Sequence, residues 1–173
     1  MPRHDRAAAL EHRRERRAHA DYTGGVYGSM LATTVVIGAG TLGDFPRLYV
    51  VTLLLLSGVA FWLAHVHAQL FGARLASQQA LDRRTVLHVC RDEWPIVKAA
   101  VPPALAVAVS PLLGLDIKGA LWLAVAVAVA GQVGWSVAAA RRAGASGRQT
   151  ALSAVVNLVI GLLIMSFKIF LKH

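Results

Sequence analysis

The feature that most constrains this chain is a series of five apolar runs, each about 20 residues long, separated by arginine-rich or turn-forming segments. A helix of that length rises about 30 Å, at about 1.5 Å per residue, which matches the hydrocarbon core of a bilayer. All nine acidic residues lie between the runs or at their ends. The pattern therefore predicts an all-α, polytopic membrane protein.

The composition agrees with this fold class, because 56% of the residues are hydrophobic and only 16% are charged. We place a basic arm and five spans at residues 1–20, 23–41, 48–70, 94–115, 119–140 and 150–171. With the N-terminus inside, the cytoplasmic segments hold 14 of the 18 lysine and arginine residues. This bias predicts a cytoplasmic N-terminus and an external C-terminus. The chain as a whole also resembles small membrane proteins of high-GC bacteria, which implies a bacterial cytoplasmic membrane.

The arginines on the predicted cytoplasmic side indicate contact with anionic lipid headgroups. Residues 71–93 combine arginines with regularly spaced apolar residues, which is typical of an amphipathic surface helix. The basic arm has no aromatic or base-reading residues among its arginines, so no nucleic-acid partner is expected.

The first span is rich in small residues that recur at every fourth position. These form two sets, one of Gly24, Gly28 and Ala32 and the other of Gly25, Ser29 and Thr33. Gly131 and Gly134 place two more glycines in the fourth span. Small residues at this spacing let helix backbones approach closely in a membrane. They predict helix packing within one chain, and the alternatives for the first span are a contact between the subunits of a homo-oligomer or a pore-lining role.

The second span carries polar side chains inside an apolar sequence. At about 100° per residue, one helix face holds Gly58, Trp62, His65 and Gln69. His65 lies about 9 Å of helix rise from the inner end of the span. A polar group at that depth must meet protein or water. Three roles stay open for the imidazole: a hydrogen bond to Tyr27, Ser29 or a carbonyl that ties two helices, a pH-sensing gate, or a haem or metal ligand.

The chain lacks the residue patterns of common catalytic and coupled-transport sites. No carboxylate lies in the middle of a span, where proton- or sodium-coupled carriers usually need one. No serine has an evident His/Asp pair, and the lone Cys90 has no zinc-site spacing to a histidine. We therefore predict no enzymatic activity, no cofactor and no metal site. Pro102-Pro103 in the third span predicts a kink, which either serves packing or opens a cavity.

The first two spans also carry a recognisable pair of motifs. The first span opens with Tyr22-Thr23-Gly24-Gly25-Val26-Tyr27-Gly28, and the second span carries Phe61-Trp62 followed by His65. This pair resembles the bacterial and lysosomal potassium-permeable channels with a Phe-Ser-Asp motif, which read aromatic-Ser-Asp-Gly-Val-aromatic-small and then aromatic-Trp-x-x-His. Gly24 stands where that family has its motif aspartate, and the family has six spans per repeat where this chain shows five.

The resemblance implies an assembly of subunits around a central axis, with the first span lining the pore. It assigns Tyr22, Thr23 and Gly25 to the motif and residues 29–33 to the pore-facing stretch. It assigns Trp62 and His65 to a network that packs against the first span.

Together, these patterns lead us to expect a homo-oligomeric, passive, cation-permeable channel. The candidate pore-lining or gating residues are Tyr27, Ser29, Leu31, Thr33, Trp62, His65 and Gln69. Two alternatives stay open: a non-enzymatic scaffold or assembly protein, and a small-solute carrier or exporter accessory with a cavity at the Pro102-Pro103 kink.

Overall fold

The computed structural model describes the backbone of residues 3–43, 45–77 and 82–170 and the side chains of residues 21–41, 43, 45–75, 82–166 and 170. These residues form helices and short connections, and no strand occurs among them. The elements are α1 (Arg3–Leu42), α2 (Arg47–Ser77), α3 (Arg83–Asp92), α4 (Pro95–Val109), the 3-10 helix η1 (Ser110–Leu113), α5 (Ile117–Arg142) and α6 (Gly147–Phe170).

Within the described residues, four helical stretches are long and apolar enough to cross a membrane: Arg47–Leu75, Arg83–Leu113, Ile117–Arg142 and Gly147–Ser166. The chain is therefore an all-helical, multi-pass membrane protein, and this part of the sequence prediction is confirmed. α1 is not among these four stretches, which are drawn only from residues whose side chains the structure describes.

α1 joins two segments that the sequence treats separately. The basic arm and the first predicted span form one continuous helix of 40 residues. Alanine, arginine and glutamate favour helix, and no glycine or proline occurs between Arg3 and Thr23 to end one. The arm therefore continues the axis of the span.

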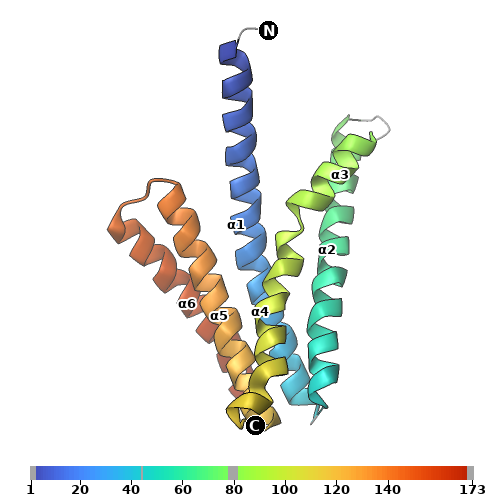
Figure 1. The fold of residues 1–173 in the computed structure, drawn as a ribbon, viewed down its shortest axis with the longest axis vertical. Coiled ribbons are helices and arrows are strands. Elements are labelled where there is room, and N and C mark those ends of the chain that lie inside the picture. Colours follow the sequence, from blue (N-terminus) through green and yellow to red (C-terminus); the bar gives the residue numbers. More distant parts are fainter. Residues whose placement is uncertain (1–2, 44, 78–81, 171–173) are drawn as a thin grey trace.

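α1 is the central helix of the bundle. Figure 1 shows α5 and α6 on one side of it and α2, α3 and α4 on the other, and α1 contacts α2, α4, α5 and α6. Apolar residues from α1, α2, α4 and α5 form the core, with Val36, Leu54, Val107 and Val125 almost completely buried. α6 is the most peripheral of the candidate spans, and most of its aliphatic side chains are exposed.

Local capping sequences fix the helix ends. At the start of α5 the Asp116 carboxylate accepts a hydrogen bond of 2.7 Å from the Gly119 backbone N–H. Before α6, Ser146 donates its backbone N–H to Gln149 Oε1 at 2.9 Å, and Gln149 donates its own to Ser146 Oγ at 3.4 Å. This reciprocal pair is a capping box.

The predicted surface helix over residues 71–93 is divided. α2 continues to Ser77, and the separate helix α3 begins at Arg83 and has no buried residue. Both Pro102 and Pro103 lie inside α4, which continues through them, with Pro103 buried and Pro102 exposed. Because proline has no N–H, these two positions donate no intrahelical hydrogen bond to the carbonyls one turn earlier.

The described arginines gather at one end of the bundle. That end, where α1 begins, carries Arg74, Arg83, Arg84, Arg91, Arg141, Arg142 and Arg148, and we call it the arginine-rich end (Figure 1). At the opposite end Arg47 donates from Nε to Ser110 Oγ at 3.2 Å and from its guanidinium to the Leu115 carbonyl. Arg47 therefore ties the start of α2 to the connection between η1 and α5.

Replacing Arg47 with methionine is expected to lower the free energy of unfolding by about 1.5–3 kcal/mol, because two hydrogen bonds from a charged donor are lost. Ser110 Oγ still donates to the Val107 carbonyl, so the substitution leaves no buried hydroxyl without a hydrogen bond. Denaturant unfolding in detergent micelles measures the change, with Lys118→Met, an exposed cation at the same end, as the matched control. Equal stabilities of the two variants would contradict the role given to Arg47.

Candidate functional site

One glycine face of α1 packs against α4. A Cβ atom at Gly28 would lie 2.8 Å from Ala99 Cβ and 2.9 Å from the Ile96 carbonyl oxygen. A Cβ atom at Gly24 would lie 3.1 Å from Pro95 Cβ. The glycines are thus what permits the close approach of α1 and α4, and this face is occupied within the chain.

The next face of α1 packs against α5. A Cβ atom at Gly25 would lie 2.5 Å from the Trp135 ring, and Ser29 Oγ lies 3.3 Å from the Cβ position of Gly131. Ser29 and Thr33 are 1% and 0% exposed. Their hydroxyls donate back along α1, to the Gly25 carbonyl at 2.8 Å and to the Ser29 carbonyl at 2.9 Å. Both residues were predicted to line a pore, but within this chain they lie buried in a helix contact.

The two glycines predicted for packing on α5 differ in their surroundings. Gly131 meets α1, whereas no atom lies within 4 Å of a Cβ position at Gly134. Gly134 is exposed, because it lies about 80° round α5 from the midpoint between Gly131 and Trp135. It therefore makes no helix contact within the chain.

A third face of α1 points out of the bundle and carries hydroxyl groups. Its exposed residues are Thr23, Tyr27, Thr34 and Thr41, which fall within an arc of about 40° at the α-helical period. We call these four residues the hydroxyl face. Thr34 Oγ1 donates to the Met30 carbonyl at 3.1 Å, and Thr41 Oγ1 donates to the Gly38 carbonyl at 2.8 Å.

The hydroxyl face distinguishes α1 from the other long helices. In residues 55–64 of α2, 101–109 of α4, 122–134 of α5 and 151–163 of α6, no exposed residue carries a hydroxyl or a charge. Those surfaces suit contact with lipid hydrocarbon. Outside these segments α2 exposes Tyr49 and Thr52 and α6 exposes Ser166. What distinguishes α1 is that its exposed hydroxyls, at Tyr27 and Thr34, continue into the middle of the helix.

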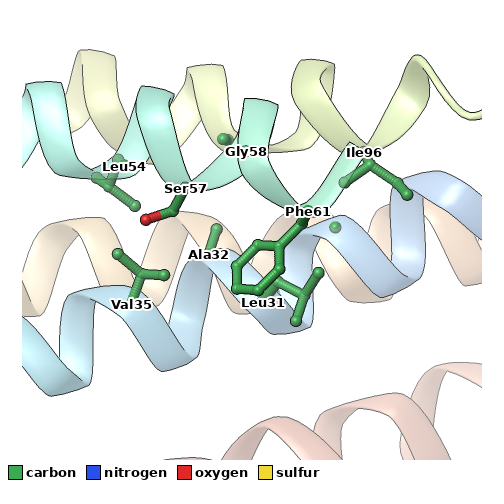
Figure 2. A pocket seen from close by; sticks show the side chains of 10 residues that line it. Leu31, Ala32, Val35, Leu54, Ser57, Gly58, Phe61 and Ile96 are labelled. Atoms are coloured by element: carbon green, nitrogen blue, oxygen red, sulfur yellow. The ribbon is translucent and has the colours of Figure 1, made fainter. Parts of the chain in front are cut away.

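An apolar groove lies beside the hydroxyl face, between α1 and α2, and α4 contributes Ile96 and Ala100 to its lining (Figure 2). Its lining consists of Gly28, Leu31, Ala32, Val35, Leu54, Ser57, Gly58, Phe61, Ile96 and Ala100. The free volume inside is about 10 Å³, about the space of one water molecule. Ser57 brings the one hydroxyl in this lining, so the groove offers little to a polar solute.

Two rings close the groove toward the arginine-rich end. The rings of Tyr27 and His65 lie with their centroids 4.8 Å apart and their planes at 46°. Each ring lies one turn beyond a groove residue, Leu31 on α1 and Phe61 on α2. Of the three roles considered for His65, this geometry matches a tie between two helices, made through a ring contact with Tyr27. Ser29, the other side chain considered as its partner, faces α5.

Trp62 and Gln69 contact α3 and the connection between α3 and α4, whereas the resemblance assigns Trp62 to a network against the first span. Trp62 Nε1 donates to the Cys90 carbonyl at 2.9 Å, and its ring meets Trp94 edge-on at 5.5 Å. Gln69 Nε2 donates to Glu93 Oε1 at 3.4 Å. The face of α2 that carries Gly58, Trp62, His65 and Gln69 lies over the contact between α1 and α4. Residues on the two edges of this face therefore reach different parts of the chain.

Gln132, a residue that was not predicted to belong to the site, is fully buried in α5. Its Nε2 donates to the Asn157 carbonyl of α6 at 2.9 Å, and its Oε1 has no hydrogen-bond partner. Gly161 makes room for this contact, since a Cβ atom there would lie 2.9 Å from Val129 Cγ1. A glutamine in the middle of an apolar run was the signal that could have identified it.

Comparisons with protein-family models, with curated proteins and with solved structures give no match for this chain.

Proposed function

We propose that this protein is a small, passive, cation-permeable channel, formed by several copies of the chain with the hydroxyl faces of their α1 helices around a common path. The observation that carries the proposal is the contrast between α1 and the other long helices, whose exposed middle segments bear neither hydroxyls nor charges. The hydroxyl face is less favourable in hydrocarbon than an aliphatic face would be. Around a water-filled path, its hydroxyls can contact water and ions.

The hydrogen bonds of the hydroxyl face favour cations over anions. The Thr34 and Thr41 hydroxyl hydrogens are donated to carbonyls of α1 itself. At these two positions, what remains available to a permeating ion is oxygen lone pairs, which attract cations. No carboxylate lies within a predicted span to couple movement to a proton, so the proposed movement is diffusion down a gradient.

The proposed path needs more than one copy of the chain. Two faces of α1 pack against α4 and α5, and the groove beside α2 has a free volume of only about 10 Å³. A hydrated ion does not fit in this groove. Placing the third face of α1 opposite its counterpart in a neighbouring copy would enclose the hydroxyls on all sides.

The proposal includes five spans, with α1 as the fifth membrane-crossing helix beside the four apolar ones. The arginine-rich end is taken as cytoplasmic by the positive-inside rule, in a bacterial plasma membrane. Arg83, Arg84 and Arg91 of α3 then lie at the inner surface, where anionic headgroups attract them.

Flux through liposomes that contain only this protein tests the function. We expect a potassium or sodium gradient to dissipate without any coupled partner, and the detergent-solubilised particle to contain several copies. A monomeric particle would contradict the channel, and so would a rate of ion leakage no higher than that of protein-free liposomes.

A non-transporting assembly protein is the second candidate. It is favoured by the same internal hydrogen bonds, because a threonine whose hydroxyl is satisfied within its own helix can also face another helix without water. Such a protein would form oligomers that conduct nothing. Oligomers in detergent combined with an absence of flux would select this function.

A further inference from the structure

A second feature, on the side of α1 that faces α5, points to a ligand. Four residues form a ladder at the arginine-rich end: Gly25, Trp135, Tyr22 and Arg142. The Trp135 indole lies directly on the bare backbone of Gly25, Tyr22 meets that indole edge-on at 6.0 Å, and the Arg142 guanidinium carbon lies 5.9 Å from the centre of the Tyr22 ring. We propose that this ladder is a binding site for the phosphate group of an anionic phospholipid.

The ladder places a cation beside a fixed aromatic ring. Trp135 has no freedom toward α1, because its ring already occupies the space of a Gly25 side chain. Tyr22 packs on that fixed ring, and the guanidinium of Arg142 lies over Tyr22. An arginine that stacks on a ring by its face keeps the N–H groups at its edge available, and this edge matches two phosphate oxygens.

The charges around the ladder favour an anion. Arg141 and Arg142 are both exposed at the last turn of α5, where the partial negative charge of the helix end also favours cations. Asp21, which precedes Tyr22 in the sequence, carries a carboxylate, and this carboxylate is paired with Lys98 of α4 at 3.3 Å. Among the residues whose side chains are described, Arg142 forms no ion pair. The guanidinium therefore keeps its charge available to a ligand.

The position of the ladder favours a lipid as the source of the phosphate. α5 has 26 residues and so rises about 39 Å, more than the hydrocarbon core of about 30 Å, which brings its last turn to headgroup level. Tryptophan and tyrosine are the aromatic residues enriched at this level. On the i, i+4 row of α5 that leads to Arg142, the small residues Ala126, Ala130 and Gly134 are exposed, and an acyl chain can lie against them.

Binding of phosphatidylglycerol to the detergent-purified full chain tests the site, by native mass spectrometry and by the shift of the unfolding temperature. Arg142→Gln is expected to weaken binding about tenfold, because a charge-assisted pair is lost. Tyr22→Leu should weaken it severalfold, while Tyr22→Phe keeps the ring and the affinity. Arg148→Gln removes an equivalent charge from the start of α6 and should leave binding within about twofold of wild type.

Equal losses in Arg142→Gln and Arg148→Gln would overturn the site, since binding would then depend on overall charge alone. Equal binding of phosphatidylcholine and phosphatidylglycerol would overturn the requirement for an anionic lipid. Inorganic phosphate is the remaining probe, and Arg142-dependent binding of phosphate without binding of phosphatidylglycerol would overturn the lipid source. The site does not depend on the channel, because lipid binding is measured without flux.

Discussion

Replacing Gly28 with leucine is expected to prevent the bundle from assembling. The first atom added, Cβ, would already lie 2.8 Å from Ala99 Cβ and 2.9 Å from both the Cα and the carbonyl oxygen of Ile96. Two of these three atoms belong to the backbone of α4, which cannot rotate away as a side chain can. α1 would have to separate from α4, so we expect a loss above about 3 kcal/mol, beyond the usual range for overpacked sites.

Gly28→Ala gives a graded version of the same test. Alanine favours helix over glycine by about 1 kcal/mol, so a lower stability in this variant isolates the steric contact. Gly72→Ala on α2 is the matched control, because no atom lies within 4 Å of a Cβ position there. Unfolding in detergent micelles should rank Gly72→Ala at or above wild type, Gly28→Ala below it, and Gly28→Leu last. A Gly28→Ala protein as stable as Gly72→Ala would contradict the close packing of α1 on α4.

Thr34→Val should reduce cation flux about tenfold, since every subunit loses the oxygen that faces the proposed path at this level, an interaction of about 1.4 kcal/mol with a charged partner. The neighbouring Thr33→Val is the matched control. Thr33 is of the same residue type but is 0% exposed and faces α5, so its replacement should leave flux within about twofold of wild type.

Both variants are compared at equal amounts of folded oligomer in the liposomes. A larger loss of flux in Thr33→Val than in Thr34→Val would mean that the face of α1 turned toward α5 conducts. Equal flux in both variants and wild type would remove the hydroxyl face from the path.

The membrane fold could be predicted from the sequence because its determinants are local. An apolar run of about 20 residues is enough to specify a membrane helix, and a segment such as Gly43-Asp44-Phe45-Pro46 is too short for anything but a turn. The approximate bounds of the spans followed from these features, and α2, α5 and α6 begin within a few residues of the predicted positions.

The direction of each α1 face could not be predicted in the same way. In a soluble protein hydrophobicity separates the inside from the outside, but lipid is as apolar as a helix surface, so Thr33 and Thr34 carry no such signal. Which of them is buried depends on Gly131, nearly 100 positions later, which lets α5 approach the Ser29 side of α1. The contact of Trp62 with the Cys90 carbonyl could not be predicted either. Every residue has a backbone carbonyl, so the sequence does not indicate which one accepts the hydrogen bond.

The accessibility of single cysteines tests the central claim, that the hydroxyl face of α1 lines a water-filled path. In a Cys90→Ser background, which removes the chain's one cysteine, cysteines are placed at Thr34, at Thr33 and at the lipid-exposed Leu56 of α2. A charged, membrane-impermeant thiol reagent is then added to the assembled protein in liposomes, and it reacts where water lets a thiolate form. The account predicts modification at position 34 and none at positions 33 and 56. A cysteine at position 34 as unreactive as the one at position 56 would contradict it.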